Sequence, residues 1–482
     1  MNNHLIFHKS RPGKMGVTLP ECDVPTTSLE DIFSGEELRS NSANLPEVTE
    51  PDVVRHYTNL SSKNHHVDKD VYPLGSCTMK YNPKVNDMMA GLPGLSSIHP
   101  AQPEETVQGA LAIMAGLEEQ LKAMTGMERF TLQPTAGSQG ELVGVLIMQA
   151  YHAKNGDNRK QILIPDTAHG TNPATVAMGG YDVLQVKSDE RGRVDLDDLR
   201  QKLSPEVAGM MLTQPNTLGL FEDNITEITH LVHEAGGLMY MDGANLNALL
   251  GLVKSADMGF DILHINLHKT FSTPHGGGGP GSGPIGVTSE LEKFLPSPLV
   301  VENDGRYSLE STRSDSVGRV HTFFGNFGIL VRAYTYIRML GLEGIHAISR
   351  QAILNANYLM SKLTDAYDIA FDGPCMHEFV LSANRQKERG IRALDIGKRL
   401  LDFGFHAPTV YFPLNVPEAM MTEPTDSETM ESLDRFAEAM LKIDEESKSD
   451  PEKVRNAPYS TPVRRLDETA ANRNPNLRWR PE

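Results

Sequence analysis

One lysine and one aspartate in this sequence each directly follow an apolar stretch, a position where both side chains could do chemistry. Lys269 comes after "DILHINLH" and Asp242 after "LMYM". Burial disfavours a charged ammonium and lowers its pKa, which makes Lys269 a candidate nucleophile toward an aldehyde. A buried carboxylate needs a partner, because leaving it unpaired is costly. A protonated ring nitrogen would serve Asp242, and so would the N-terminus of a helix.

Two other segments could complete a binding site around these residues. In "QPTAGSQGE" (133–141) the backbone N–H groups of Ala136 and Gly137 could close around an anion, with the Ser138 hydroxyl as a further donor. In "PDTAHGTNP" (165–173) His169 could stack on a planar ring or cap the next helix. The four consecutive glycines at 276–279 would let the backbone pass close to a ligand. They lack the Gly-Lys-Ser/Thr ending of a Walker loop.

Together these features match what one coenzyme, pyridoxal 5'-phosphate, requires. The 136–138 segment would bind its phosphate, and Lys269 would condense with its aldehyde. Asp242 would keep the pyridine nitrogen protonated, so that the ring accepts electrons, and His169 would cover the ring. Asn216 or Thr217 could reach the phenolate side of the ring. The sequence therefore predicts a pyridoxal phosphate enzyme.

The elements that must position these residues form a regular alternation. Short apolar segments read as strands at 129–133, 161–165, 181–186, 207–212, 238–241 and 261–267. Helical patterns lie between them, including 107–124 with a Gly126 stop and 224–237 with a capping box from Asn224 to Glu227. The alternation predicts an α/β fold with a parallel sheet covered on both faces. Four of the candidate features then fall at the carboxyl edge of that sheet, where such folds bind ligands.

The regular alternation of strands and helices does not extend to the segments before and after this region. We expect an N-terminal arm over 1–103, a coenzyme-binding large domain over 104–341, a small α+β domain over 342–450 and a tail over 451–482. The arm is rich in turn-forming residues and includes "YPLGSCTMKYNP". We also expect a long helix over 318–341 and a second capping box from Thr425 to Glu428.

Composition limits the partners and the compartment. A net charge of −18 over 482 residues argues against nucleic acid or an anionic membrane as the main partner. No stretch approaches the roughly 18 apolar residues of a membrane helix, and no signal peptide is evident at the start. Three scattered cysteines without a Cys-x-x-Cys pair fit a reducing, cytoplasmic location. The histidines lack metal-ligand spacing such as His-Glu-x-x-His, so no metal site is expected.

Several longer motifs are far more specific than a generic coenzyme signature. They include "PLGSCTMKYNP", "LPGLSSIHPAQPEE", "DTAHGTNPA", "HKTFSTPHGGGGPGSGP" and "TPVRRLDE". With them the chain resembles, over nearly its whole length, the second-subunit branch of the decarboxylating glycine dehydrogenases, the P-proteins of the glycine cleavage system. The resemblance implies an aspartate-aminotransferase-like, fold-type-I architecture. It also implies that Lys269 carries the coenzyme, that His169 stacks on its ring and that His268 helps to hold it.

The same resemblance implies an activity and partners. Such an enzyme decarboxylates glycine and passes the aminomethyl group to the lipoyl disulfide of H-protein. The second subunit pairs with a first subunit in a heterotetramer of two copies of each, and the arm and basic tail are candidate contacts. Two alternatives stay open: another fold-type-I enzyme, such as an amino acid decarboxylase or an aminotransferase, and a catalytically silent scaffold. A substrate-clamping arginine, for which Arg313, Arg319 and Arg332 are candidates, would favour an aminotransferase.

Overall fold

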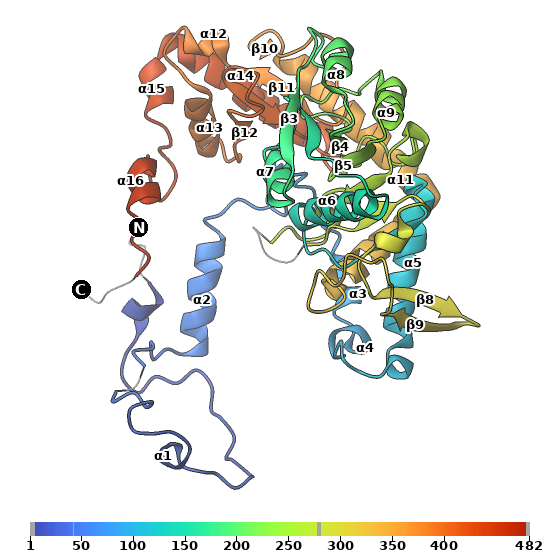
Figure 1. Cartoon of the computed structure of the whole chain (residues 1–482). Helices are drawn as coiled ribbons and strands as arrows, with labels where there is room; N and C mark the ends of the chain where they lie inside the picture. The colour runs from blue at the N-terminus through green and yellow to red at the C-terminus, as the bar shows by residue number, and fades with distance from the viewer. Residues whose placement is uncertain (1–4, 42, 277–280, 479–482) are drawn as a thin grey trace. The chain divides into compact units, whose positions relative to one another are not determined.

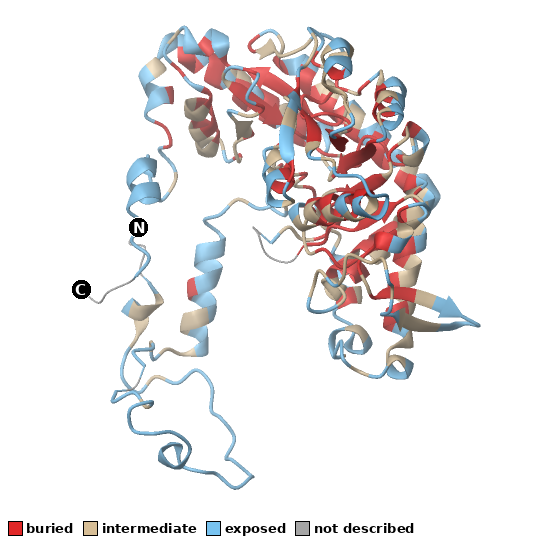
Figure 2. Ribbon diagram, in the orientation of Figure 1, coloured by how far each residue is buried: buried red, intermediate tan, exposed pale blue. Residues whose placement is uncertain are grey.

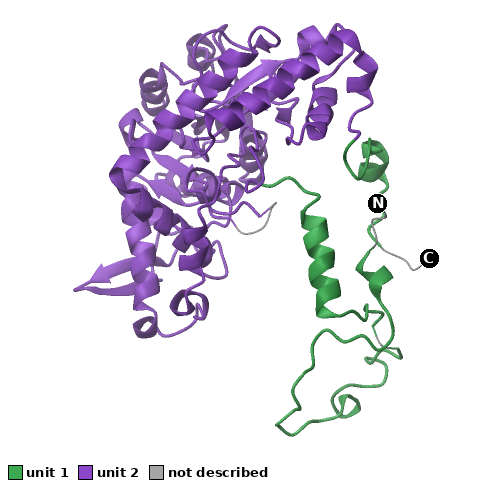
Figure 3. Cartoon of the chain, turned by 180° about the vertical axis from the view of Figure 1, so that it is seen from behind, with its two compact units in different colours: residues 1–66, 460–482 green, residues 67–459 purple. Residues whose placement is uncertain are grey.

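The computed structural model describes residues 5–41, 43–276 and 281–478, and the chain divides into two compact units (Figure 3). Unit 1 comprises residues 1–66 and 460–482, and unit 2 comprises residues 67–459. The division differs from the predicted boundaries at 103 and 451, because residues 67–103 belong with unit 2. Val71 is buried in the core around the smaller sheet, and the Gly75 N–H donates to the Met421 carbonyl at 3.2 Å.

The centre of unit 2 is a seven-stranded sheet in the order β1-β7-β6-β5-β4-β2-β3. Its strands are β1 (Arg129–Thr131), β2 (Gln161–Pro165), β3 (Asp182–Val186), β4 (Val207–Thr213), β5 (Leu238–Gly243), β6 (Ile262–Ile265) and β7 (Ile285–Val287). All six predicted strands are present, and five of them run parallel. The sheet is mixed, since the strand that was not predicted, β7, pairs antiparallel with both β6 and β1. "IGV" is too short to stand out as a strand.

Helices flank this sheet as the alternation predicted (Figure 1). They are α5 (Gln108–Thr125), α6 (Gly137–Lys154), α7 (Thr171–Met178), α8 (Leu196–Lys202), α9 (Ile225–Glu234) and the single turn α10 (Leu267–Thr270). Helix α5 ends at Gly126 in the left-handed conformation, as predicted. The capping box at Asn224 was wrong, because that residue precedes α9 without a side-chain cap bond.

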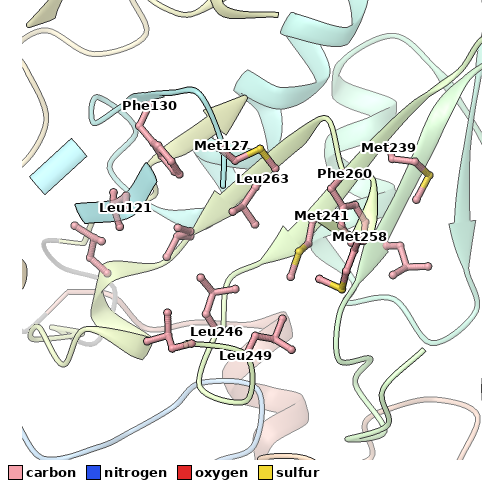
Figure 4. Packing of buried hydrophobic residues seen from close by; sticks show 14 of the residues in the cluster. Leu121, Met127, Phe130, Met239, Met241, Leu246, Leu249, Met258, Phe260 and Leu263 are labelled. Carbon is pink, nitrogen blue, oxygen red and sulfur yellow. The ribbon is translucent and has the colours of Figure 1, made fainter. Parts of the chain in front are cut away.

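Two apolar clusters, one on each face, hold the large sheet between its helices. Strand side chains from β4, β5 and β6 are almost wholly buried, as their continuous apolar sequences require for a sheet covered on both sides (Figure 2). Figure 4 shows one cluster, in which Met239, Met241 and Leu263 pack with Phe260 and Leu246. The apolar packing fixes the strand ends from which the polar residues project.

A second, four-stranded sheet has the order β10-β11-β13-β12 and its own apolar core. Its antiparallel strands are β10 (Asp368–Ile369), β11 (Phe379–Ser382), β12 (Thr409–Val410) and β13 (Ala419–Thr422). Helices α12 (Asn384–Lys387), α13 (Ala393–Asp402), α14 (Met430–Ser449) and α15 (Pro451–Arg455) accompany it. Helix α14 is capped by Thr429, so the predicted capping box at Thr425 was wrong.

Helix α11 (Phe327–Leu363) belongs to both parts of unit 2, since it contacts both α5 and α14. It starts later than the predicted residue 318 and is broken at Gly341, whose φ is 62°. The remaining elements of unit 2 are α3 (Lys84–Ala90), α4 (Pro93–Ser96), the hairpin β8 (Leu299–Asn303) and β9 (Arg306–Glu310), and the short turns η2 (Glu104–Thr106), η3 (Ala256–Met258) and η4 (Glu292–Phe294).

Unit 1 contains little regular structure and almost no core. Its elements are η1 (Ile6–Lys9), α1 (Leu29–Ile32), α2 (Glu50–Ser61) and α16 (Glu468–Arg473). Among its described residues only His56 is buried. Within the described part of the whole chain, no helix combines the length and apolar character needed to cross a membrane.

Candidate active site

The carboxyl ends of the parallel strands in unit 2 open into a cavity of about 320 Å³. Lys269, Asp242, His169 and His268 all line it, together with the 136–138 segment. They lie at or soon after the carboxyl ends of β1, β2, β5 and β6, which run in the same direction and so bring these residues to one edge of the sheet. The structure thus brings together the predicted site residues, with the exception of Asn216.

Lys269 lies on the single turn of α10 rather than at the end of a strand. Strand β6 ends at Ile265, and the backbone then turns so that the Lys269 N–H donates to the Asn266 carbonyl at 3.1 Å. The side chain is half-buried in the cavity wall. The position of Lys269 affects the pKa of the histidines around it. Burial and the Lys269 charge lower the pKa of His169 and His275, and lower the pKa of His268 to about 3.

Asp242 stands near the end of β5 with only 4% of its surface exposed. Its Oδ2 accepts from Asn172 Nδ2 at 3.0 Å, and its Oδ1 accepts from the Ala244 N–H at 3.1 Å. His264 Nε2 lies 3.3 Å from the same Oδ1. Burial raises the pKa of Asp242, but His264, Asn172 and Lys269 outweigh it, and the pKa falls below its usual value. The carboxylate is therefore held ionised inside the protein.

The N-terminus of α6 faces the cavity, with Ala136 as its N-cap residue. A Cβ at Gly137 would overlap the Asn266 carboxamide, lying 2.7 Å from its Nδ2, so a larger residue here would have to displace that side chain. Free N–H groups at the start of an 18-residue helix form a site for an anion. Ser138 is exposed and also lines the cavity.

The structure explains the glycine at position 283, just after the glycine tract. The Gly283 N–H donates to the Pro134 carbonyl at 2.9 Å, and a Cβ on Gly283 would lie 2.5 Å from the Ala136 carbonyl carbon. This close approach of two backbones holds the start of α6 in place. Residues 277–280, which include most of the four-glycine run, lie outside the described part of the chain.

His169 lies in the loop after β2 and is oriented by its neighbours. Its Nδ1 lies 3.0 Å from the Thr171 hydroxyl, which itself donates to Glu141 Oε1 at 2.8 Å. Its ring meets Phe412 edge-on, with centroids 5.6 Å apart. Because its pKa is lowered, the imidazole is neutral near pH 7 and can contact a planar ring without adding charge.

Asn216, which was predicted to contact the coenzyme, makes its hydrogen bonds elsewhere. Its Nδ2 donates to the Gly192 carbonyl at 2.8 Å, and its Oδ1 accepts from the N–H groups of Leu218 and Leu220 at 3.0 and 3.1 Å. These bonds build the loop after β4, and Asn216 does not line the cavity. The alternative residue, Thr217, does line it, and its hydroxyl donates to the Thr167 carbonyl.

Several buried polar atoms around the cavity have no partner among the described residues. They are Asn266 Oδ1, His268 Nδ1, Thr213 Oγ1 and His377 Nδ1. Buried polar groups are normally hydrogen-bonded, so an unpaired group requires an explanation. A polar ligand in the cavity would supply those partners. Pyridoxal phosphate, with a phosphate, a phenolate and a ring nitrogen, fits this distribution.

Sequence reasoning missed one wall of the cavity, formed by Glu378 and His377 beside Ser76 and Cys77. Glu378 immediately precedes β11 and Glu423 immediately follows β13. A charged residue next to a short apolar strand was the signal that revealed Asp242. The same signal was present in "HEFVLS" and "AMMTE".

Comparisons with known proteins agree on one family. The model described as "Aminotransferase class-V" matches residues 113–279, and the model described as "Glycine dehydrogenase, C-terminal domain" matches residues 348–461. A probable glycine dehydrogenase (decarboxylating) subunit 2 from Caldanaerobacter subterraneus is 58% identical over 478 residues, covering 99% of each chain. The corresponding protein from Chloroherpeton thalassium is 56% identical, covering 100% of this chain and 99% of its own.

Solved structures share the fold. The crystal structure of glycine decarboxylase (P-protein) in inhibitor-bound form superposes with a TM-score of 0.73 at 21% identity, covering 86% of this chain and 95% of that one. A glutamate decarboxylase from Lactobacillus brevis gives 0.65 at 16% identity, covering 86% and 97%. The predicted fold-type-I architecture and the predicted pyridoxal phosphate cofactor are confirmed. The chain belongs to the family of the second subunit of decarboxylating glycine dehydrogenase, the P-protein of the glycine cleavage system.

Proposed function

We propose that this chain decarboxylates glycine with pyridoxal phosphate and transfers the aminomethyl group to the lipoyl disulfide of an H-protein. The observation that carries the proposal is the cavity that joins a half-buried Lys269 to a buried, ionised Asp242. The 54–58% identical relatives of full length support the same activity. When bound, the coenzyme supplies an electron sink for the pair left by the departing carboxylate.

The chain's own residues would hold the coenzyme at four points. Lys269 would bond its aldehyde carbon, and the α6 N-terminus at 136–138 would take the phosphate, with His268 beside it. Asp242 would accept a hydrogen bond from the ring N–H and keep that proton in place. His169 would cover the ring as a neutral imidazole. These roles stay predictions, and each follows from the side chain's position in the cavity wall.

The charges around the cavity favour decarboxylation over amino transfer. No arginine is among the described residues that line it. Arg313 lies with Glu310 and Glu292, Arg332 with Asp87, and Arg319 donates to the Thr322 carbonyl. An arginine clamp would stabilise the carboxylate in the ground state, whereas carbon dioxide loss removes that charge. The described wall instead offers four histidines whose pKa is lowered by burial, together with the carboxyl groups of Glu141, Asp242 and Glu378.

A partner would supply what unit 1 lacks. Large apolar side chains of this unit are more than half exposed, including Val17, Leu19, Ile32, Leu45 and Leu477. With one buried described residue, unit 1 has no core of its own to stabilise it. The name shared by the relatives, subunit 2, implies a first subunit. We propose that unit 1 contacts that subunit in a heterotetramer of two copies of each.

We propose a cytoplasmic location on the basis of the cysteines. Cys22, Cys77 and Cys375 are all free, as expected for a reducing compartment.

The exchange of labelled bicarbonate into glycine tests the activity directly. We expect exchange by the chain together with its first subunit, and we expect it to require a lipoylated carrier. Lys269→Ala should abolish exchange, whereas replacing Lys442, exposed on α14 of unit 2, by alanine should not. Amino transfer from glycine to a 2-oxo acid without a lipoyl carrier would contradict the proposal and favour an aminotransferase.

A further inference from the structure

The cavity wall formed by His377 and Glu378 has no proposed role in holding the coenzyme. A pair of buried carboxyl groups, Glu378 and Glu423, lies there. The antiparallel register pairs Phe379 with Thr422, so Glu378 and Glu423 lie side by side just beyond the paired ends of β11 and β13. They are 4% and 0% exposed. A carboxylate oxygen of Glu378, a carboxylate oxygen of Glu423 and a ring nitrogen of His377 all lie within 4.8 Å of one another. Two carboxylates this close in a buried site cannot both be ionised at low cost.

The hydrogen bonds decide which of the two carries the charge. Glu423 accepts from the Thr78 N–H at 3.1 Å, from the Thr78 hydroxyl at 2.8 Å, and from the side-chain amides of Asn245 and Asn247 at 2.9 and 3.1 Å. Glu378 accepts one bond, from the Ser76 N–H at 2.8 Å. Donors stabilise the ionised form, so Glu423 is the carboxylate and Glu378 keeps the proton.

Geometry also places the proton on the cavity side. Glu378 lines the cavity with Lys269, whereas Glu423 lies behind it and does not. The charged and titratable groups facing Glu378 are Glu423, His377, Cys77 and Lys269. Burial and Glu423 raise the pKa of Glu378 to about 8, against the opposing effects of the Ser76 N–H and Lys269.

Most of the other titratable groups of the wall are poorly suited to release a proton near neutral pH. Lys269 would bond the coenzyme, His264 lies against Asp242, and Glu141 accepts from the Thr171 and Thr175 hydroxyls. Burial lowers the pKa of His169, His268, His275 and His377, which leaves all four neutral. Asp242 is already ionised, as described above. Burial raises the pKa of the Cys77 thiol, which makes it a weaker acid.

The proposed reaction needs such an acid. When the aminomethyl carbon bonds to one sulfur of the carrier disulfide, the S–S bond breaks and its electron pair stays on the second sulfur. The pair from the broken carbon–carboxylate bond forms the new C–S bond, so the disulfide is the oxidant and carbon dioxide leaves. The second sulfur then needs one proton to become a thiol.

We propose that Glu378 is the catalytic acid that gives this proton to the leaving sulfur, with Glu423 as the positioning residue that keeps Glu378 protonated beforehand. Solvent returns the proton to Glu378 after the carrier leaves. The inference rests on the proposed function for the identity of the acceptor. The location of the proton rests on the structure alone.

Infrared difference spectroscopy of the full chain without carrier or glycine tests the location. We expect a carboxylic acid C=O band that titrates near pH 8. The band should be absent in Glu378→Gln and should titrate at lower pH in Glu423→Gln. Glu222→Gln, which changes a buried carboxyl group outside this cavity, is the matched control and should retain it. A band that is unchanged in Glu378→Gln overturns the inference. So does the finding that the purified protein holds a metal ion between Glu378 and Glu423 in place of the proton.

Thiol release from the lipoylated carrier tests the role. For the wild type with its first subunit, we expect the rate to fall as pH rises past about 8. Glu378→Gln should be slower by about 10²-fold and should lack that fall, with the coenzyme absorbance unchanged. Equal pH profiles for the two proteins overturn the proposed role. If the wild type shows the infrared band but no carrier-dependent thiol, the proposed function fails while the proton assignment stands.

Discussion

Asp242 shows how a single buried charge is stabilised within this fold. An isolated carboxylate in the interior would be protonated, yet Asn172, His264 and the Ala244 N–H give this one three stabilising contacts. The Tyr240 hydroxyl in turn lies 2.7 Å from His264 Nδ1 and orients the ring. The negative charge is therefore already in place before a protonated ring nitrogen arrives.

Replacing Asp242 should separate coenzyme binding from catalysis. We expect Asp242→Asn to slow glycine decarboxylation by about 10²- to 10³-fold, the usual cost of removing one preorganised electrostatic group. The coenzyme should still bond Lys269, because that amine is untouched. Steady-state rates and the visible absorbance of the coenzyme measure the two effects. Asp257→Asn, on an exposed turn, is the control, and equal activity of the two variants would argue against this role.

The stability of the protein should depend on Glu378 and pH. Its pKa is about 8 in the folded protein against 4.5 ordinarily, so the folded state binds this proton more tightly than the unfolded chain. The stabilisation is complete below about pH 4.5 and is lost as the pH rises to about 8. We expect the unfolding temperature of the wild type to decline more steeply over that window than that of Glu378→Gln. Parallel declines of the two unfolding temperatures would show that the pKa of Glu378 is not raised in the folded protein.

Strand ends were predictable because apolar runs are easily recognised. The strand before Asp242 and the loop with His169 were located from sequence, and both lie at the cavity. The turn α10 was missed because "LHKT" carries no periodic signal of its own. The Glu378–Glu423 pair could not be found either. It depends on the register between two short strands, and a local pattern carries no register.

Segment 73–80 joins the two sheets of unit 2 to one site. Leu74 forms a bridge with Thr422, and the following turn aims the Ser76 and Thr78 N–H groups at Glu378 and Glu423. Ser76 and Thr78 have positive φ values of 69° and 47°, which residues other than glycine rarely adopt. The motif "PLGSCTMK" is thus explained by contacts far away in sequence.

Gly137 offers a test at the level of the element. Gly137→Ala should weaken coenzyme binding by at least about 10-fold, because the methyl group would displace Asn266 and the start of α6 from the anion. Gly109→Ala in helix α5 is the matched control, since its Cβ would meet nothing within 4 Å. Titration of each variant with pyridoxal phosphate gives the affinities. Equal affinity in both variants would remove the α6 N-terminus from the site.

Unit 2 has its own cores, whereas the described residues of unit 1 form none. The sequence indicated an arm from its turn-rich composition, but it placed the boundary at 103 instead of 66. Residues 67–103 read as irregular by themselves. Their order comes from contacts such as Arg332 to Asp87 at 2.7 Å, which no local pattern contains.

The exposed apolar side chains of unit 1 should matter only for assembly. We expect a variant with Leu29, Ile32 and Phe33 changed to serine to bind the first subunit at least about 10-fold more weakly, since each loses buried apolar area. Coenzyme absorbance should stay unchanged. Met178→Ser, exposed on α7 of unit 2, serves as the control in sedimentation velocity. Unaltered assembly of the triple variant would contradict this role for unit 1.

The role of Lys269 is tested most directly by identifying the lysine that bonds the coenzyme. Lys80 is a useful internal comparison, because its side chain is 1% exposed but lies 3.0 Å from Asp426. Burial lowers the pKa of Lys80, yet Asp426 outweighs it and keeps the amine protonated and unreactive. Borohydride reduction of the coenzyme-loaded protein, followed by peptide mapping, should place the reduced adduct on Lys269. An adduct on Lys80, or on no lysine at all, would show that Lys269 does not carry the coenzyme.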